Sequence, residues 1–211
     1  MYFLLLILFA FTVIFFSFTS RIKEYVNALA FQGIILFFIV IVNLKTSHLL
    51  SLIFILIETI GFKTILIPYI LNRVIYENEI SREVDSGVSN FFSILAMIFI
   101  FSFGFFVSYV TKNNLNLENM FHFGISFSSI IAGLYIILTK KRLITHIIGF
   151  MVFENGIFLF SLSVVENMPL VVNLGILLEI FMIVFISGFF ISKIKENYND
   201  DNIDSLTDLK D

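Results

Sequence analysis

Long apolar runs alternate with short polar connections along almost the whole chain. A helix that crosses a bilayer needs about 20 mostly apolar residues, because each residue adds 1.5 Å of length. Runs of roughly this length cover residues 2–20, 25–43, 48–71, 88–110, 121–138, 143–165 and 169–192. The pattern therefore predicts an all-α polytopic membrane protein with about seven transmembrane helices, and it leaves no room for a soluble catalytic domain.

Polar stretches divide these predicted helices into units. Residues 1–88 form an N-terminal membrane unit of three helices, closed by a polar cytoplasmic loop over residues 72–87. Residues 89–192 hold four further membrane helices. Residues 193–211 form a tail. From Glu196 to Asp211 it has six acidic residues and one basic residue, Lys210. We expect this tail to be a polar cytoplasmic segment.

The basic residues predict how the helices are oriented. With seven spans, most of them fall on one side of the membrane: Arg21, Lys23, Arg73, Arg82, Lys140, Lys141, Arg142, Lys193 and Lys195. Only Lys45 and Lys112 fall on the other side. Because Lys and Arg are retained on the cytoplasmic side, the N-terminus is predicted outside and the C-terminus inside, in the cell (inner) membrane. The first apolar run has no basic residues before it, so we expect a retained span and not a cleaved signal peptide.

The composition supports lipid as the main solvent of the surface. The 211 residues are 59% hydrophobic and 14% charged, and their mean hydropathy is +1.01, whereas soluble domains are about a quarter charged. The absence of Cys excludes disulfides, thiolate metal sites and iron–sulfur ligation within this chain. With three separated His we expect no metal and no cofactor. A phosphate loop, a nucleophile elbow and a basic nucleic-acid face are also missing, so we expect no nucleic-acid partner.

Four ionisable residues lie inside predicted spans, namely Glu58, Lys63, Glu154 and Glu179. Each costs roughly 2.5–3.5 kcal/mol to insert at a helix centre, so such groups persist mostly where a pathway or a buried pair requires them. Glu154 and Glu179 lie near the middle of two helices joined by a short connection, which predicts antiparallel neighbours with both carboxyls at similar depth. We interpret them as proton-relay groups. Two protonated carboxyls hydrogen-bonded between helices are the structural alternative.

Lys63 and Glu58 are five positions apart, which separates them by about 140° around a helix axis. Lys63 is therefore expected to meet a carboxylate on a different helix or a different subunit, either in a relay or in a structural ion pair. Pro68 deprives the carbonyl of Thr64 of its usual donor, and such a weak point suits a water-lined path. Glu58 is placed on the same polar axis.

His146 lies about two turns, some 12 Å, from Glu154 on the same predicted helix. It is a candidate for proton transfer between the relay and the basic end, although a His near a helix end is often merely interfacial. His48 and His122 also lie at span ends, and their positions suggest no role. Small residues predict close helix packing at two places, Gly124/Ser128/Ala132 and Gly149/Gly156.

Three segments resemble a known family. Residues 145–158 read THIIGFMVFENGIF, residues 173–179 read NLGILLE, and residues 63–68 read KTILIP. The first looks like the Gly…Glu-Asn-Gly stretch of the hydrogenase-4 component E family, whose C-terminal half is similar to complex I subunit K, a three-helix protein with two intramembrane carboxylates. Glu154 and Glu179 match those carboxylates, and Lys63 to Pro68 match the Lys-x-x-x-x-Pro segment of the family. The resemblance extends from about Phe31 to Ser192.

The resemblance implies a membrane subunit of a complex I-like, group 4 membrane-bound hydrogenase or related oxidoreductase. Its C-terminal helices would form a subunit K-like unit and contribute carboxylates to proton translocation. Its partners would be antiporter-like and other membrane subunits, with peripheral hydrogenase and iron–sulfur subunits further away. This chain would be non-catalytic, because redox chemistry would occur in those partners. Two alternatives stay open from the residues: a stand-alone secondary ion or solute transporter, and a non-conducting membrane scaffold.

Overall fold

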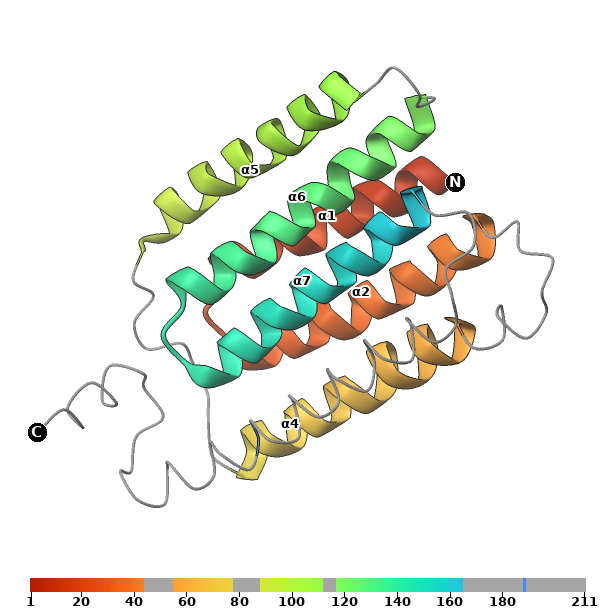
Figure 1. Cartoon of the computed structure of the whole chain (residues 1–211). Coiled ribbons are helices and arrows are strands. Elements are labelled where there is room, and N and C mark those ends of the chain that lie inside the picture. The colour runs from red at the N-terminus through yellow and green to blue at the C-terminus, as the bar shows by residue number, and fades with distance from the viewer. Residues whose placement is uncertain (44–54, 78–87, 112–116, 165–187, 189–211) are drawn as a thin grey trace, which may run out of the picture.

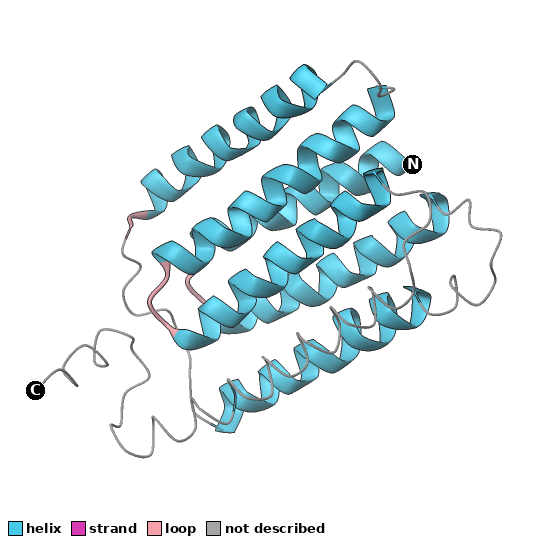
Figure 2. Ribbon diagram, in the orientation of Figure 1, coloured by secondary structure: helices cyan, strands magenta, loops and turns pink. Residues whose placement is uncertain are grey.

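The computed structural model describes residues 1–43, 55–77, 88–111, 117–164 and 188. Helices account for nearly all of this part, and none of it is strand (Figure 2). The elements, in chain order, are α1 (Tyr2–Phe18), α2 (Ile22–Asn43), the π-helical segment η1 (Glu58–Leu66), α4 (Ile67–Glu77), α5 (Asn90–Val110), α6 (Leu117–Thr139) and α7 (Leu143–Val164). The prediction of an all-α protein is confirmed over these residues.

Five helices in the described residues are long and apolar enough to cross a membrane: Ile22–Val42, Ile55–Tyr76, Asn90–Val110, Asn119–Thr139 and Leu143–Leu162. Helix α1 is apolar but shorter, with 17 residues. These lengths support the prediction of a multi-pass membrane protein. The predicted span over residues 169–192 lies outside the described residues, except for Gly188. A Cβ atom at Gly188 would lie 2.9 Å from Cγ2 of Val74, so this residue packs closely on α4.

The third helix extends further than the sequence predicted. We expected residues 48–71 to span the membrane and a polar loop to begin at residue 72, but the helix continues through η1 and α4 to Glu77. Leu71 and Ile75 are buried on one side of α4, while Asn72, Arg73 and Tyr76 are exposed on the other. This amphipathic pattern keeps the segment helical where its polar residues had suggested a loop.

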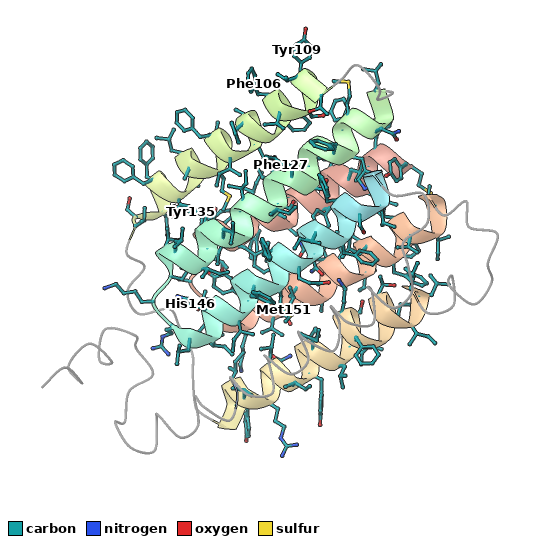
Figure 3. The ribbon with its side chains drawn as sticks, in the orientation of Figure 1. Phe106, Tyr109, Phe127, Tyr135, His146 and Met151 are labelled. Carbon is teal, nitrogen blue, oxygen red and sulfur yellow. The ribbon has the colours of Figure 1, made fainter. Side chains whose placement is uncertain are left out.

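The helices run back and forth as an antiparallel bundle (Figure 1). Helix α6 packs on α7, α5 and α1, and α2 packs on α1, α7 and η1. Helix α5 lies at one outer edge of the bundle and α4 at the opposite edge. Phe106 and Tyr109 of α5 point away from the other helices and are 62% and 61% exposed (Figure 3). An apolar outer surface of this kind fits contact with lipid or with a partner helix.

Small residues allow the central helices to approach closely, as predicted. A Cβ atom at Gly104 of α5 would lie 2.9 Å from the carbonyl oxygen of Gly124 and 3.2 Å from Cβ of Ser128. A Cβ atom at Gly156 of α7 would lie 2.8 Å from the backbone nitrogen of Ile130. Each position therefore requires Gly, and both sides of α6 are in close contact with a neighbouring backbone.

The basic connections share one end of the bundle. The α1–α2 connection, the C-terminal end of α4 and the α6–α7 connection all lie there (Figure 1). The Nζ atom of Lys140 is 5.9 Å from the centre of the Tyr25 ring, which ties the α6–α7 connection to the first turn of α2. This arrangement agrees with the alternation of basic residues along the sequence.

Candidate functional site

Lys63 and Glu154 form a buried ion pair between η1 and α7. The Nζ atom of Lys63 lies 2.6 Å from Oε1 and 2.7 Å from Oε2 of Glu154, so the amine donates to both carboxylate oxygens. Both side chains are only 5% exposed. Glu154 lies midway along α7 (Leu143–Val164), as predicted for its position in the helix. The prediction that Lys63 meets a carboxylate on another helix is confirmed.

The helix that carries Lys63 is irregular around this residue. Its backbone is π-helical over Glu58–Leu66, and the backbone N–H of Ile67 bonds to the carbonyl of Phe62. The hydroxyl of Thr64 donates to the carbonyl of Thr59 at 2.8 Å. Because Pro68 has no N–H, the turn before it cannot keep a complete α-helical ladder. The predicted weak point is therefore a π-helical segment, a feature that is common at functional sites.

Gly33 brings α2 directly against this segment. A Cβ atom at Gly33 would lie 2.7 Å from Oγ1 of Thr64 and 3.1 Å from the carbonyl carbon of Lys63. A Cβ atom here would require the Thr64 hydroxyl to rotate and the η1 backbone to shift by a few tenths of an ångström, so Gly33 allows the two helices their close approach. The close contact places the neighbouring residue, Gln32, beside the ion pair.

Two amide side chains extend the polar cluster. The Nζ atom of Lys63 also lies 3.2 Å from Oδ1 of Asn155, and Nδ2 of Asn155 donates to Oε1 of Gln32 at 3.0 Å. Gln32 is fully buried, and its Nε2 atom has no hydrogen-bond partner among the described residues. A buried donor of this kind favours an internal water molecule, and a site that binds water is what a proton path needs.

The ring of Phe158 also packs against the amine of Lys63. Lys63 Nζ lies 4.4 Å from the centre of this ring, within the range of a cation–π contact. Phe158 is one turn after Glu154 on α7, so the same helix supplies the carboxylate and the aromatic face. The ammonium is therefore held by charge on one side and by an aromatic surface on the other.

The structure brings together only some of the predicted residues. Glu58 begins η1, but its side chain is outside the described part, and so is all of Glu179. His146 lies in the first turn of α7, at the basic end (Figure 3). Its Nδ1 atom is 2.8 Å from the carbonyl oxygen of Arg142. His146 precedes Glu154 by eight positions, which is about 12 Å along the helix axis. His146 is therefore not part of the ion-pair cluster.

Sequence reasoning missed Gln32 as a member of the site. A single Gln in an apolar run carries no charge and inserts at modest cost, so it did not stand out. The available signal was its position beside Gly33 near the middle of a span. Among the described residues, no group of three His, Cys, Asp or Glu side chains could hold a metal ion.

The cluster is suited to holding and transferring a proton. A proton that passes from the ammonium of Lys63 to the carboxylate of Glu154 converts a charged pair into a neutral pair, and the net charge of the site stays the same. Each form has hydrogen-bond partners in the cluster, because the amides of Asn155 and Gln32 can both donate and accept. Such a pair can therefore change state inside the membrane without leaving an unpaired charge.

The chain is similar to the uncharacterized protein Rv0085 of Mycobacterium tuberculosis. The two sequences are 24% identical over 196 residues, which cover 90% of this chain and 87% of the relative. No protein-family model and no solved structure matches the chain. The functional argument therefore rests on the residues of the cluster.

Proposed function

We propose that this chain is a proton-translocating membrane subunit of a complex I-like, group 4 (hydrogenase-4 type) membrane-bound hydrogenase or a related oxidoreductase. The observation that carries the proposal is the ion pair between Lys63 and Glu154, buried midway along α7 beside a π-helical segment. The resemblance of residues 145–158 and 63–68 to the hydrogenase-4 component E family supports the choice of complex. Glu179 and Glu58 are proposed as further groups on the same path.

Stability alone does not account for the pair. Replacing a buried ion pair by apolar residues of similar volume is often neutral or stabilising, because the desolvation of two charges offsets their attraction. Inside a membrane the desolvation is larger still, and ionisable residues there usually mark an ion path. Because the ion pair offers little net stability, proton transfer is the better explanation for its presence.

The proposal includes the placement of the chain in the membrane. We place seven spans in the cell inner membrane, with the N-terminus outside and the C-terminus inside. The basic connections at one end of the described bundle support a single cytoplasmic side. Antiporter-like subunits would lie beside the chain in the bilayer. Peripheral hydrogenase and iron–sulfur subunits would hold the redox centres, which leaves the present chain with proton transfer only.

The test uses the tagged full chain, purified with the subunits that accompany it and reconstituted in liposomes. Proton movement is followed with a pH-sensitive dye while the complex turns over its electron donor. We expect Glu154→Gln to lower proton translocation per electron by about tenfold or more, since proton transfer by a positioned side chain contributes ~10²–10⁴-fold. The matched control is Glu24→Gln, which removes a carboxylate that is 41% exposed at a helix end.

Three outcomes would overturn the proposal or redirect it. Unchanged translocation in both Glu154→Gln and Lys63→Met would remove the pair from the path. Loss of assembly with unchanged translocation per assembled complex would favour a scaffold. Purification as a solitary carrier that moves a solute would favour a secondary transporter.

A further inference from the structure

A groove of about 710 Å³ lies between α1 and α2. Its volume is within the range of about 300–1,000 Å³ that is typical of sites for small molecules. Apolar side chains line most of it: Leu8, Phe11, Phe15 and Phe18 from α1, and Ala28 and Phe31 from α2. Phe11, Phe18 and Phe31 are exposed, so the groove opens at the surface of the bundle. In a multi-pass membrane protein, a molecule dissolved in the bilayer can enter such a groove from the side.

The apolar part of the groove has the length of one leaflet. Leu8 and Phe18 are ten positions apart on α1, which is about 15 Å along the helix axis. The hydrocarbon core of a bilayer is about 30 Å thick, so this length is half of the core. Thr12 also lines the groove, but its hydroxyl donates to the carbonyl of Phe9 at 2.6 Å. The groove therefore offers an apolar channel that fits one acyl chain of a lipid.

Charged side chains lie at one end of this groove, next to the α1–α2 connection. Glu24 and Asn27 line it there, and Lys23 neighbours Asn27 because the two are four positions apart on α2. The carboxylate of Glu24 is bonded within the chain, since it accepts from the hydroxyl of Thr19 at 2.8 Å and from Arg21 at 3.3 Å. Arg21 is 63% exposed and uses one N–H in this contact, so its other donors can bind an anion. The end of the groove thus has two cations and one carboxylate that is already paired.

We propose that the groove binds one molecule of an anionic phospholipid, with an acyl chain between α1 and α2 and the phosphate at Arg21 and Lys23. The guanidinium can bind two phosphate oxygens at once, and the ammonium of Lys23 adds a second positive charge. The amide of Asn27 can donate to an ester oxygen of the lipid. A free anion would use only the charged end, and an apolar molecule would use only the channel. A phospholipid uses both.

The bound lipid would stabilise the first helix of the bundle. Helix α1 has 17 residues and is shorter than the five described helices that can span a membrane. An acyl chain in the groove covers its outer Phe side chains and joins them to α2. Lipid binding is independent of the proposed function, because the groove includes none of the residues assigned to the proton path.

The test uses the tagged full chain, purified in detergent with the subunits that accompany it and stripped of lipid. Dioleoylphosphatidylglycerol, dioleoylphosphatidylcholine and glycerol 3-phosphate are each titrated while the melting temperature is measured by circular dichroism. We expect the anionic lipid to raise the melting temperature with a saturable dependence on its concentration. The phosphatidylcholine should need a concentration about tenfold higher, because its headgroup has no net charge. Glycerol 3-phosphate should have no effect, since it lacks an acyl chain.

One pair of variants tests the charged end of the groove. Arg21→Gln/Lys23→Gln should raise the half-saturating concentration of the phosphatidylglycerol by about tenfold or more, because each basic residue near a membrane surface attracts anionic lipid. The matched control is Arg73→Gln/Lys141→Gln. It removes the same charge at the same end of the bundle, outside the groove, and should leave the titration unchanged.

A second pair of variants tests the apolar channel. Ala28→Phe fills the groove and should abolish the saturable rise for the phosphatidylglycerol. The matched control is Ala96→Phe, the same change at a half-buried Ala of α5, which should keep that rise. If Ala28→Phe does not assemble, Ala28→Leu takes its place, and an unchanged titration in that variant would reject the lipid site.

Three other results would overturn the proposal. Equal titrations with both phospholipids would show ordinary contact with the bilayer and no anionic site. A rise with glycerol 3-phosphate equal to that with the phosphatidylglycerol would show an anion site without a channel. The photoreactive residue benzoylphenylalanine in place of Phe11 should cross-link to phospholipid, and cross-linking to a polypeptide instead would show that a protein segment fills the groove.

Discussion

Two contacts of α7 differ in how they hold the bundle together. Against α6, the helices are regular and Gly133 and Gly156 bring the two backbones into direct contact. Against η1 and α2, the contact is made by an ion pair, two amides and a π-helical turn. The glycine contacts with α6 depend on shape alone, whereas the contact with η1 places two charges in the buried interior beside the apolar ring of Phe158.

Under the proposed function, the close-packed contact serves stability and the polar contact serves proton transfer. Close backbone packing is the ordinary way to join helices where no hydrophobic effect drives them together. At Gly133 and Gly156 the α6–α7 contact satisfies that need without any ionisable group. The η1–α7 contact carries costly charges on an irregular helix, and neither is required to join two helices. We therefore expect that removing both charges of the polar contact abolishes translocation with little change in stability, whereas overpacking the α6–α7 contact lowers stability.

The largest effect is expected when the polar contact is made apolar. Glu154→Met leaves the amine of Lys63 without its carboxylate, and we expect a loss of about 3–5 kcal/mol in the free energy of unfolding. The double change Lys63→Met/Glu154→Met removes both charges, and its stability should return to within about 1 kcal/mol of the wild type or exceed it. Unfolding by SDS in mixed micelles, followed by far-ultraviolet circular dichroism, measures both values.

Translocation should behave differently from stability in these variants. The double variant should assemble and remain unable to move protons, because it has neither the amine nor the carboxylate. A double variant as unstable as Glu154→Met would contradict the comparison, since it would show that the ion pair is needed to hold the helices together.

A smaller effect is expected at the close-packed contact. Gly133→Ala would place a Cβ atom 2.5 Å from the backbone nitrogen of Phe153, so α6 and α7 must move apart. We expect a loss of about 1–3 kcal/mol, as for other overpacked sites. The control is Gly61→Ala, because the new Cβ atom would meet only Cγ2 of Ile57 at 3.7 Å. The same unfolding assay should find Gly61→Ala neutral or slightly stabilising. Equal losses of stability in both variants would show that close packing between α6 and α7 is not the cause of the loss in Gly133→Ala.

Much of the fold could be predicted from the sequence, because apolar length and small-residue spacing are local signals. Five described spans and the close approach at Gly124 and Gly156 follow from such signals. The end of the third helix was predicted wrongly, because the burial of Leu71 and Ile75 depends on neighbours that the local pattern does not reveal. Contacts between residues that are distant in the sequence are harder still to predict from it. The mismatch of Lys63 with Glu58 predicted a partner on another helix, but only the three-dimensional arrangement identifies Glu154.

The finest test concerns the uncharged part of the polar contact. Gln32→Met removes the acceptor of Asn155 together with an unpaired buried donor, so the two effects offset each other and we expect a change of no more than about 1 kcal/mol. Asn155→Leu should cost more, about 1–3 kcal/mol, because it leaves both the oxygen and the nitrogen of Gln32 without partners. Combining the two changes should then cost no more than Asn155→Leu alone, since the unsatisfied amide is gone.

This double-variant cycle, measured by the same unfolding assay, reports whether Gln32 and Asn155 act as one unit. If the losses of stability in Gln32→Met and Asn155→Leu are strictly additive, the two residues do not act as one unit. The polar contact is then limited to Lys63, Glu154 and Asn155. Non-additive losses would show that Gln32 and Asn155 are coupled. If Gln32→Met also lowers translocation while stability is unchanged, the contribution of α2 to the polar contact serves proton transfer and not folding.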